Sequence, residues 1–180
     1  MRGVRAGFIA LCRNDPKFPQ ALVGKVLDFS HVMTLVVKLI NSIRAKALQH
    51  RLFKALLDEL DVAHGDLLLH AEVQGRFVDL LPEIKTFLSR RNEEHEELSD
   101  DTWLLDLGFL TDLTAKLNTL NNELQGKDRH LPHMSSALNG FKAKLGVWTT
   151  HLKNKRLTHF PNLEKMSHAI KKIFFFNPEQ

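Results

Sequence analysis

The most constraining feature of this sequence is a regular apolar repeat near its C-terminal end. Apolar residues recur at alternating spacings of four and three, at Met134, Leu138, Phe141, Leu145, Trp148 and Leu152. This spacing places every member on one face of an α-helix. The repeat therefore predicts a long amphipathic helix after the loop that contains Pro132.

A second apolar repeat precedes the first and predicts another long helix. Ser99 is a suitable N-cap, Asp100 and Asp101 suit the first turn, and Gly126 is a plausible stop. Because a short loop joins the two helices, they are expected to pack as an antiparallel hairpin. The stripe is either internal core or a seam for a second chain, and both readings stay open. The residues of this packing or partner seam are Leu110, Leu113, Leu117, Leu120, Leu138, Phe141, Leu145, Trp148 and Leu152. Trp103, near the start of the earlier helix, and Trp148 are both expected in the core.

Shorter helices are predicted before the hairpin. Helical spacing begins after Asp28, and a second stripe is expected to end near His64-Gly65. The run Leu67–Val73 is read either as a short buried strand or as another helical turn, and Gly75 is expected to break it. A third helix follows, with Pro82 in its first turn or at a kink.

These elements predict an all-α fold, an irregular helical bundle that contains the long hairpin. Residues 1–27 are expected to be a loosely ordered N-terminal segment, because Pro16 and Pro19 oppose a helix there. Residues 28–160 form the predicted helical domain, and residues 161–180 form a C-terminal tail, for which a short helix is one reading. No run is long and apolar enough for a membrane span.

Charge is sorted along the chain. Residues 1–57 carry 10 Lys and Arg against 2 Asp and Glu, residues 58–126 carry 5 against 16, and residues 127–180 carry 10 against 3. The basic ends could bind phosphate backbones, but docking against the acidic middle of the same chain is the favoured interpretation. The best basic patch is Lys153, Lys155 and Arg156, where a helix C-terminus also favours cations without any nucleic acid.

Motifs for enzymatic chemistry are not found. Asp100, Asp101, Asp106 and Asp112 resemble a metal-binding carboxylate cluster, but capping explains the first two, and the last two are expected on an exposed helix face. His130 and His133 supply only two of the four ligands that zinc usually has. Cys12 is the single cysteine, so no disulfide can form within the chain. We expect no catalytic residue, no metal site and no cofactor.

Several segments resemble domesticated hAT-type transposase sequences. The first of these segments are Ile40–Ala45, His50–Leu57, Gly65–Leu68 and Leu98–Leu104. The match continues in Asp106–Asp112, Leu117–Asn121, Leu124–Lys127 and His159–Pro161. The chain is similar there to the transposase-like half of the general transcription factor II-I repeat domain-containing protein 2 group and to its zinc-finger BED relatives. The resemblance covers roughly residues 20–161. It implies the helical insertion of an RNase H-like transposase without its catalytic residues, and an internal deletion near Gln74-Gly75.

These observations lead to three hypotheses. The first is a non-catalytic, transposase-derived helical module that contacts a nuclear protein partner. For this module the resemblance implies a nuclear location. The lone cysteine also suits the cytoplasm, and mitochondrial import is disfavoured. The second is sequence-independent nucleic-acid binding through the basic ends. The third is a truncated relic without a selected function. The sequence leaves the oligomeric state undetermined.

Overall fold

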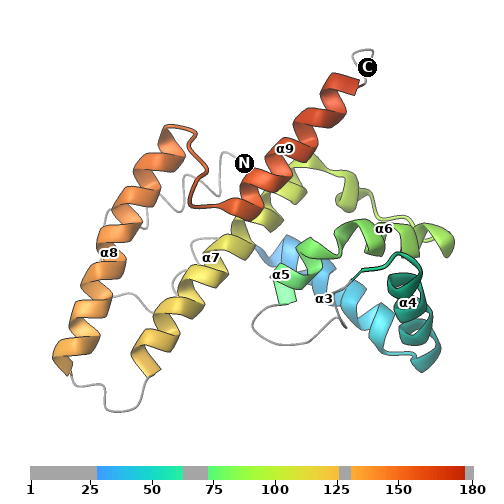
Figure 1. Cartoon of the computed structure of the whole chain (residues 1–180), viewed down its shortest axis with the longest axis horizontal. Coiled ribbons are helices and arrows are strands. Elements are labelled where there is room, and N and C mark those ends of the chain that lie inside the picture. Colours follow the sequence, from blue (N-terminus) through green and yellow to red (C-terminus); the bar gives the residue numbers. More distant parts are fainter. Residues whose placement is uncertain (1–27, 63–72, 126–130, 177–180) are drawn as a thin grey trace. The chain divides into compact units, whose positions relative to one another are not determined.

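The described part of the chain is entirely helical apart from turns and short connections. The computed structural model describes residues 28–62, 73–125 and 131–176, with side chains described for 28–62, 75–125 and 131–170. These ranges hold seven α-helices and one 3-10 helix, and no strand (Figure 1). The predicted all-α class is confirmed. The alternative of a short strand falls mainly on residues 67–72, which lie outside the described ranges.

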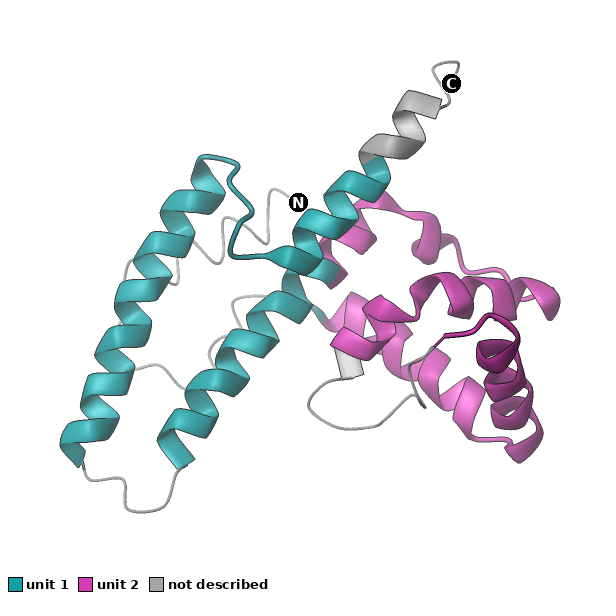
Figure 2. Cartoon of the chain, viewed as in Figure 1, with its two compact units in different colours: residues 1–29, 108–180 teal, residues 30–107 magenta. Residues whose placement is uncertain are grey.

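The chain divides into two compact units (Figure 2). Unit 2 is Ser30–Leu107, and unit 1 combines Met1–Phe29 with Gly108–Gln180. Helix α7 (Asp101–Gln125) contributes residues 101–107 to unit 2 and residues 108–125 to unit 1. The boundaries predicted from the sequence, at 27/28 and 160/161, remain predictions.

Unit 2 is built from short amphipathic helices. They are α3 (Ser30–Arg44), α4 (Ala47–Glu59), α5 (Val73–Asp79) and α6 (Leu81–Arg90), followed by the 3-10 helix η1 (Glu96–Ser99). Helix α3 packs on α4, and both α4 and α5 pack on α6. The apolar stripe of α3 is buried as its spacing predicts, and Phe53 of α4 meets Phe87 of α6 edge-on, with 5.2 Å between ring centroids. Burial of these stripes supplies the main stabilising free energy of the unit.

Two predictions about helix boundaries in unit 2 are wrong. Helix α4 ends at Glu59, before the expected stop near His64-Gly65. Gly75 was expected to break the run Leu67–Val73, but it lies inside α5, which begins at Val73. The single helix predicted around Pro82 is two helices, α5 and α6, and Pro82 occupies the first turn of α6 as expected.

Three helices end in the same hydrogen-bonded motif without glycine. Asp61, Asn92 and Lys155 have positive φ angles of 51°, 53° and 58° after α4, α6 and α8. After α8 (Leu131–Lys153), for example, the Arg156 N–H donates to the His151 carbonyl at 2.8 Å, and the Lys155 N–H donates to the Leu152 carbonyl at 3.1 Å. These two bonds define a Schellman C-cap, which usually places glycine at the left-handed position.

Helix α7 begins one residue later than predicted. Ser99 belongs to η1, and the cap is Asp100, whose Oδ1 accepts a hydrogen bond from the Trp103 backbone N–H at 2.6 Å. The predicted stop at Gly126 lies outside the described ranges, although α7 does end at Gln125.

In unit 1, α7 and α8 run antiparallel, and α9 (Pro161–Phe176) follows (Figure 1). Pro132 lies in the first turn of α8, where proline is tolerated, and not in the predicted loop. The predicted short C-terminal helix is α9. Its buried residues Leu163, Met166 and Ile170 keep helical spacing.

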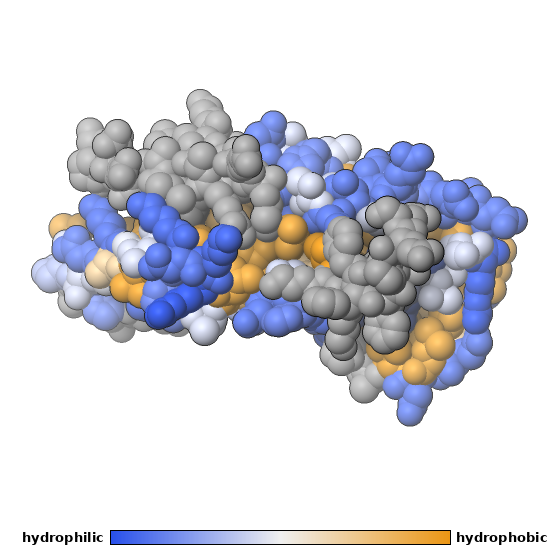
Figure 3. All heavy atoms as spheres, turned by 90° about the horizontal axis from the view of Figure 1, so that it is seen from above, coloured by the Kyte–Doolittle hydropathy of each residue, from blue (hydrophilic) through white to orange (hydrophobic). Residues whose placement is uncertain are grey.

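The outer surface of the described helices is mainly hydrophilic on the face drawn in Figure 3, with hydrophobic residues in smaller areas. Among the described helices, none combines the length and apolar composition needed to cross a bilayer.

Candidate interaction site

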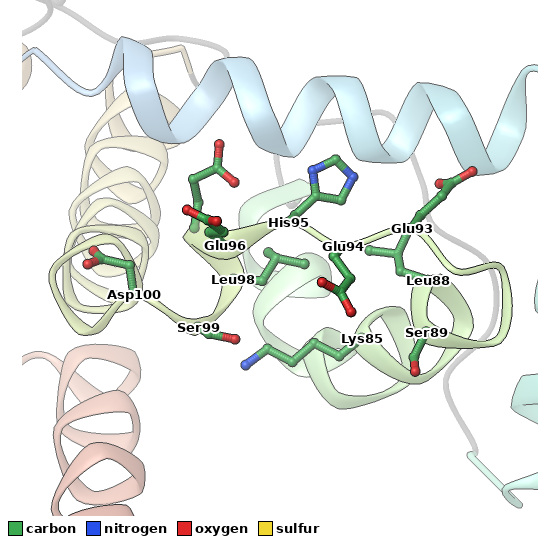
Figure 4. Close-up of a pocket in the computed structure, with 11 residues that line it drawn as sticks. Lys85, Leu88, Ser89, Glu93, Glu94, His95, Glu96, Leu98, Ser99 and Asp100 are labelled. Atoms are coloured by element: carbon green, nitrogen blue, oxygen red, sulfur yellow. The ribbon is translucent and has the colours of Figure 1, made fainter. Parts of the chain in front are cut away.

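A hollow of about 770 Å³ opens in unit 2 between α6 and the segment that leads into α7 (Figure 4). Lys85, Leu88 and Ser89 come from α6, and residues 93–100 supply the rest of its lining. The Schellman motif at Asn92 turns the chain sharply after α6, so residues 93–95 run back beside that helix before η1 begins. The sequence analysis did not single out this surface.

Five of the eleven residues that line the hollow are carboxylates. Asp100 is engaged in capping α7, and Glu93 pairs with Arg91. Within the described part of the chain, Glu94, Glu96 and Glu97 have no ion-pair partner. Three carboxylates without a cation partner among the described residues give this surface a negative potential.

Lys85 is the one cation among the residues that line this hollow. Its ammonium group extends toward Ser99 in Figure 4, and it makes no ion pair within the described residues. Burial lowers the pKa of Lys85 because removal from water disfavours its charged form. One lysine therefore faces three carboxylates that have no ion-pair partner among the described residues.

A second hollow, of about 550 Å³, shares Glu97 and Asp100 with the first. It is lined by residues of α3 and of the first turn of α7, including His31, Lys38 and Trp103. The two hollows thus adjoin at η1. We name the surface that they form the η1 surface.

Trp103 combines nearly complete burial with an unused donor. Its residue exposure is 5%, and its indole N–H has no hydrogen-bond partner in the described structure. The predicted core position of Trp103 is therefore correct, and the residue is also among those that line the second hollow. The unpaired donor is itself fully buried and costs free energy.

Asp106 lies close to the second hollow but does not stand on an exposed face as predicted. The residue is 5% exposed, and its Oδ2 lies 3.2 Å from Nε2 of the half-exposed His31. This pair joins α7 to α3 across 75 positions of sequence.

In unit 1, Asp112 is also buried, contrary to the predicted exposed face. Its Oδ1 accepts hydrogen bonds from the Asn162 backbone N–H at 3.2 Å and from Asn162 Nδ2 at 2.8 Å, and its Oδ2 accepts from the Leu163 N–H at 3.0 Å. A carboxylate of α7 therefore caps the N-terminus of α9. Burial raises the pKa of Asp112, and the α9 hydrogen bonds and Lys116 oppose this rise.

Gly108 lies one turn before Asp112 and faces the same segment. A Cβ atom at Gly108 would stand 2.9 Å from the Asn162 carbonyl oxygen and 3.0 Å from the Leu163 Cα. Phe109 stacks on Phe160, with 5.5 Å between centroids. We call the contact of Gly108, Phe109 and Asp112 with residues 160–163 the α7–α9 junction.

Lys116 continues the junction toward α8. Its Nζ lies 4.8 Å from the centre of the Trp148 ring and 4.9 Å from that of Phe160, at cation–π distance. Burial lowers the pKa of Lys116, and the Asp112 charge opposes this shift. These contacts give Asp112 and Lys116 structural roles within unit 1.

The predicted seam residues differ in burial. Leu110, Leu113, Phe141, Leu145, Trp148 and Leu152 are buried, whereas Leu117, Leu120 and Leu138 are half-buried. Whether the half-buried positions meet a second chain stays a prediction.

The predicted basic patch lies at the C-terminal end of α8. Lys153, Lys155 and Arg156 are exposed, and none has an ion-pair partner in the described ranges. Of the two histidines weighed as zinc ligands, His133 is an exposed residue of α8, and His130 lies outside the described residues. No group of three or more metal-ligating side chains converges in the described part.

Comparison with known proteins identifies the family. Residues 18–153 match the FAM200/GTF2IRD2 helical domain. The chain belongs to this family. It is 39% identical to the general transcription factor II-I repeat domain-containing protein 2 of Bos taurus over 157 residues, and 39% identical to that of Mus musculus over 159 residues. These matches cover 83% and 84% of this chain but only 16% and 17% of the relatives. No solved structure matches the chain.

The match confirms the resemblance to a transposase-derived FAM200/GTF2IRD2 helical domain. Two segments that carry the resemblance, Asp106–Asp112 and His159–Pro161, contribute to the α7–α9 junction. Phe109 of the first stacks on Phe160 of the second, and Asp112 accepts a hydrogen bond from Asn162, the residue after the second. Their sequence pattern is thus accounted for by packing and capping within unit 1. The η1 surface lies elsewhere, in unit 2.

Proposed function

We propose that this chain is a non-catalytic module of transposase-derived origin that acts in the nucleus by binding another protein. One observation carries the proposal: Glu94, Glu96 and Glu97 line an open hollow without ion-pair partners in the described residues, whereas the buried carboxylates of α7 are engaged internally. Open surface with unmatched charge suits recognition of a partner.

The engagement of Asp106 and Asp112 supports the non-catalytic part of the proposal. Divalent-metal chemistry on nucleic acids needs carboxylates that converge on the ions. Asp106 instead pairs with His31 in unit 2, and Asp112 caps α9 in unit 1. The name of the curated relatives, a general transcription factor II-I repeat protein, supports a nuclear location.

Affinity capture tests the protein-binding part. The full chain would be incubated with nuclear extract after nuclease digestion, and retained proteins would be purified and mixed with it again. We expect at least one partner to form a stoichiometric complex in size-exclusion chromatography with light scattering. A folded chain that forms no such complex would overturn the proposal.

A metal-dependent nuclease assay tests the non-catalytic part. The full chain is expected to cleave or join no DNA with Mg²⁺ or Mn²⁺. Activity that Asp106→Asn abolishes, while circular dichroism shows an intact fold, would contradict it.

Nucleic-acid binding is the second candidate, favoured by the exposed, unpaired Lys153, Lys155 and Arg156 in the described structure. Phosphate contacts would make affinity fall steeply with rising salt. Lys153→Gln/Arg156→Gln should then weaken binding, with Lys142→Gln/Lys144→Gln as the charge-matched control on exposed α8 positions. Absence of binding at about 50 mM salt would eliminate this candidate.

A further inference from the structure

Helix α4 carries apolar side chains on two of its faces. Phe53, Leu56 and Leu57 form the face that is buried in unit 2. Leu48 and Leu52 lie outside this face and are 58% and 49% exposed. They stand four positions apart, so their side chains are neighbours on the surface of the helix. A surface helix normally buries one apolar face and presents polar residues to water. Packing of α4 in unit 2 therefore does not account for the second apolar face.

The first half of α4 is also basic. Residues 44–54 contain four Lys and Arg residues and no Asp or Glu. Lys46 and Arg51 are exposed, and in the described part of the chain neither has an ion-pair partner. Arg51 follows Leu48 by three positions, so these two side chains are also neighbours. We name the surface made by Lys46, Leu48, Arg51 and Leu52 the outer face of α4.

The start of α4 favours a ligand of negative charge. Lys46 is the N-cap residue, its side chain makes no capping hydrogen bond, and the first turn contains no acidic residue. The unpaired N–H groups at the start of a helix carry roughly half a positive elementary charge. Asp or Glu in the first turn usually offsets this charge, whereas here Lys46 adds to it. A carboxylate from another molecule would meet the helix dipole and the cations together.

Contacts elsewhere hold α4 in place. Phe53 packs edge-on against Phe87 of α6, with 5.2 Å between the ring centroids. At the C-terminal end, Glu59 accepts two hydrogen bonds from Arg90, both at 2.9 Å. None of these contacts uses the outer face. The outer face is thus a preformed surface, which loses little conformational entropy when it binds a ligand.

An acidic amphipathic helix matches these properties best. Its apolar residues would cover Leu48 and Leu52, and its Asp or Glu side chains would reach Lys46 and Arg51. The phosphate backbone of a nucleic acid would satisfy the cations but leave the leucines in water. A membrane surface would need a larger apolar face, because membrane affinity grows with the buried apolar area. Charge and hydropathy together therefore favour a protein segment.

We propose that the outer face of α4 binds an acidic amphipathic helix of a partner protein. This inference rests on the proposed protein-binding function and names the chemical class of the partner. It concerns a surface that shares no residue with the η1 surface.

A peptide titration gives the direct test. The full chain would be titrated into a fluorescein-labelled helical peptide that has leucine at every third or fourth position and glutamate beside each leucine. We expect a saturable rise in fluorescence anisotropy, and the affinity should fall as salt rises because the ion pairs are exposed. A scrambled peptide of the same composition, and a peptide with lysine in place of glutamate, should each bind about tenfold more weakly or worse. Absence of binding at about 0.1 mM chain, or equal binding of all three peptides, would overturn the proposal.

Substitution of the leucines locates the site. Leu48→Gln/Leu52→Gln should weaken binding of the acidic peptide by about tenfold or more. Helical circular dichroism should stay unchanged, because both side chains are exposed. Leu131→Gln/Val147→Gln is the matched control, since these α8 side chains are 80% and 50% exposed and lie in unit 1. The control should leave the affinity unchanged, and equal losses in the two variants would overturn the proposal.

Substitution of the cations is the second measurement. Lys46→Gln/Arg51→Gln should also weaken the peptide by about tenfold or more and should reduce the salt dependence of binding. Lys142→Gln/Lys144→Gln removes the same charge from exposed α8 positions and should leave both quantities unchanged. If the two variants behave alike, binding reflects net charge alone and the proposal is overturned.

Two other ligands are measured in the same assay. A labelled DNA duplex represents a nucleic acid, and labelled vesicles that contain phosphatidylserine represent an anionic membrane. We expect neither ligand to lose affinity in Leu48→Gln/Leu52→Gln. Tighter binding of either ligand than of the acidic peptide, together with its loss in this variant, would assign the outer face to that ligand and overturn the proposal.

The protein-binding function and the outer face can fail separately. A nuclear partner that binds Leu48→Gln/Leu52→Gln with full affinity would preserve the protein-binding function and overturn the outer face as its site. Peptide binding that depends on the leucines, without any nuclear partner, would support the outer face and contradict the nuclear function. Absence of any partner, together with absence of peptide binding, would overturn both.

Discussion

Asp112 of α7 accepts a hydrogen bond from the backbone N–H of Leu163 in α9, at 3.0 Å and across 51 positions of sequence. Together with the two bonds from Asn162, it fixes the start of α9 on α7. A helix N-terminus is normally capped by a nearby residue of its own chain segment. Here the cap comes from another helix, so capping and tertiary packing of α9 are expected to be lost together.

The first prediction concerns the cap itself. Asp112→Ala leaves the Asn162 and Leu163 N–H groups without their acceptor and should lower the free energy of unfolding by about 2–4 kcal/mol. Denaturant unfolding followed by helical circular dichroism measures this loss. Glu164→Ala, a half-buried carboxylate in the first turn of α9, is the control and should cost much less. Equal losses would contradict the assigned role.

A pH dependence follows from the same carboxyl. Burial raises the pKa of Asp112 above its ordinary value of 3.8. The folded chain then holds this proton more tightly than the unfolded chain, so the contribution is fully present below that value and is lost as pH rises through the folded pKa. The difference in unfolding free energy between wild type and Asp112→Asn should therefore shrink as pH rises above 3.8 and through the raised folded pKa. A difference that grows would mean that the hydrogen bonds outweigh burial.

Gly108 provides a sharper test of the same junction. Gly108→Ala should destabilise the chain by about 1–3 kcal/mol, because its methyl group meets the backbone of Asn162 and Leu163. Gly140→Ala and Gly146→Ala in α8 meet nothing within 4 Å and should each stabilise by up to about 1 kcal/mol. Thermal unfolding of all three variants checks the contrast. A stabilising Gly108→Ala would show that α9 shifts to make room.

Helix ends illustrate what the sequence could not provide. Periodicity predicted the buried face of α3, because burial of a helix face requires that spacing, whereas Leu117, Leu120 and Leu138 of the α7 and α8 stripes are only half-buried. The predicted stop of α4 relied on glycine near His64-Gly65, but Asp61 occupies the left-handed position earlier in the chain. The Schellman hydrogen bonds tolerate this aspartate, so the glycine did not locate the end of α4.

The candidate site was missed for a related reason. A run of acidic residues such as 92–97 normally faces water, so the sequence alone does not mark it as part of a hollow. Only the turn at Asn92 returns this run to α6, and only α3 and Trp103 complete the second hollow. Asp106 and Asp112 were misplaced because their partners, His31 and Leu163, are distant in sequence.

Lys155 permits a test of the C-cap. Its backbone has a φ of 58°, which a residue with a Cβ adopts at a cost. Lys155→Gly should stabilise the chain by about 0.5–1 kcal/mol, less than the full strain because glycine also gains freedom in the unfolded state. Lys155→Ala removes the same charge but keeps a Cβ, so it should give no such gain. Equal stabilities by denaturant unfolding would exclude relief of strain.

The last prediction concerns the exposed pair between Glu59 and Arg90 in unit 2. Nη1 and Nη2 of Arg90 donate to Oε2 and Oε1 of Glu59, both at 2.9 Å, near the ends of α4 and α6. These hydrogen bonds, and then the guanidinium charge, lower the pKa of Glu59 below its ordinary value of 4.5. The pair's contribution to stability is therefore present above that pH and is lost as pH falls through the folded pKa.

Carboxyl titration by NMR should show the pKa of Glu59 rising toward 4.5 in Arg90→Gln. Arg90→Lys keeps the charge but not the two-pronged geometry, so it should give an intermediate value. High salt should reduce the shift, because both side chains are more than half exposed, at 57% and 53%. An unchanged pKa in Arg90→Gln would show that the pair does not persist in solution.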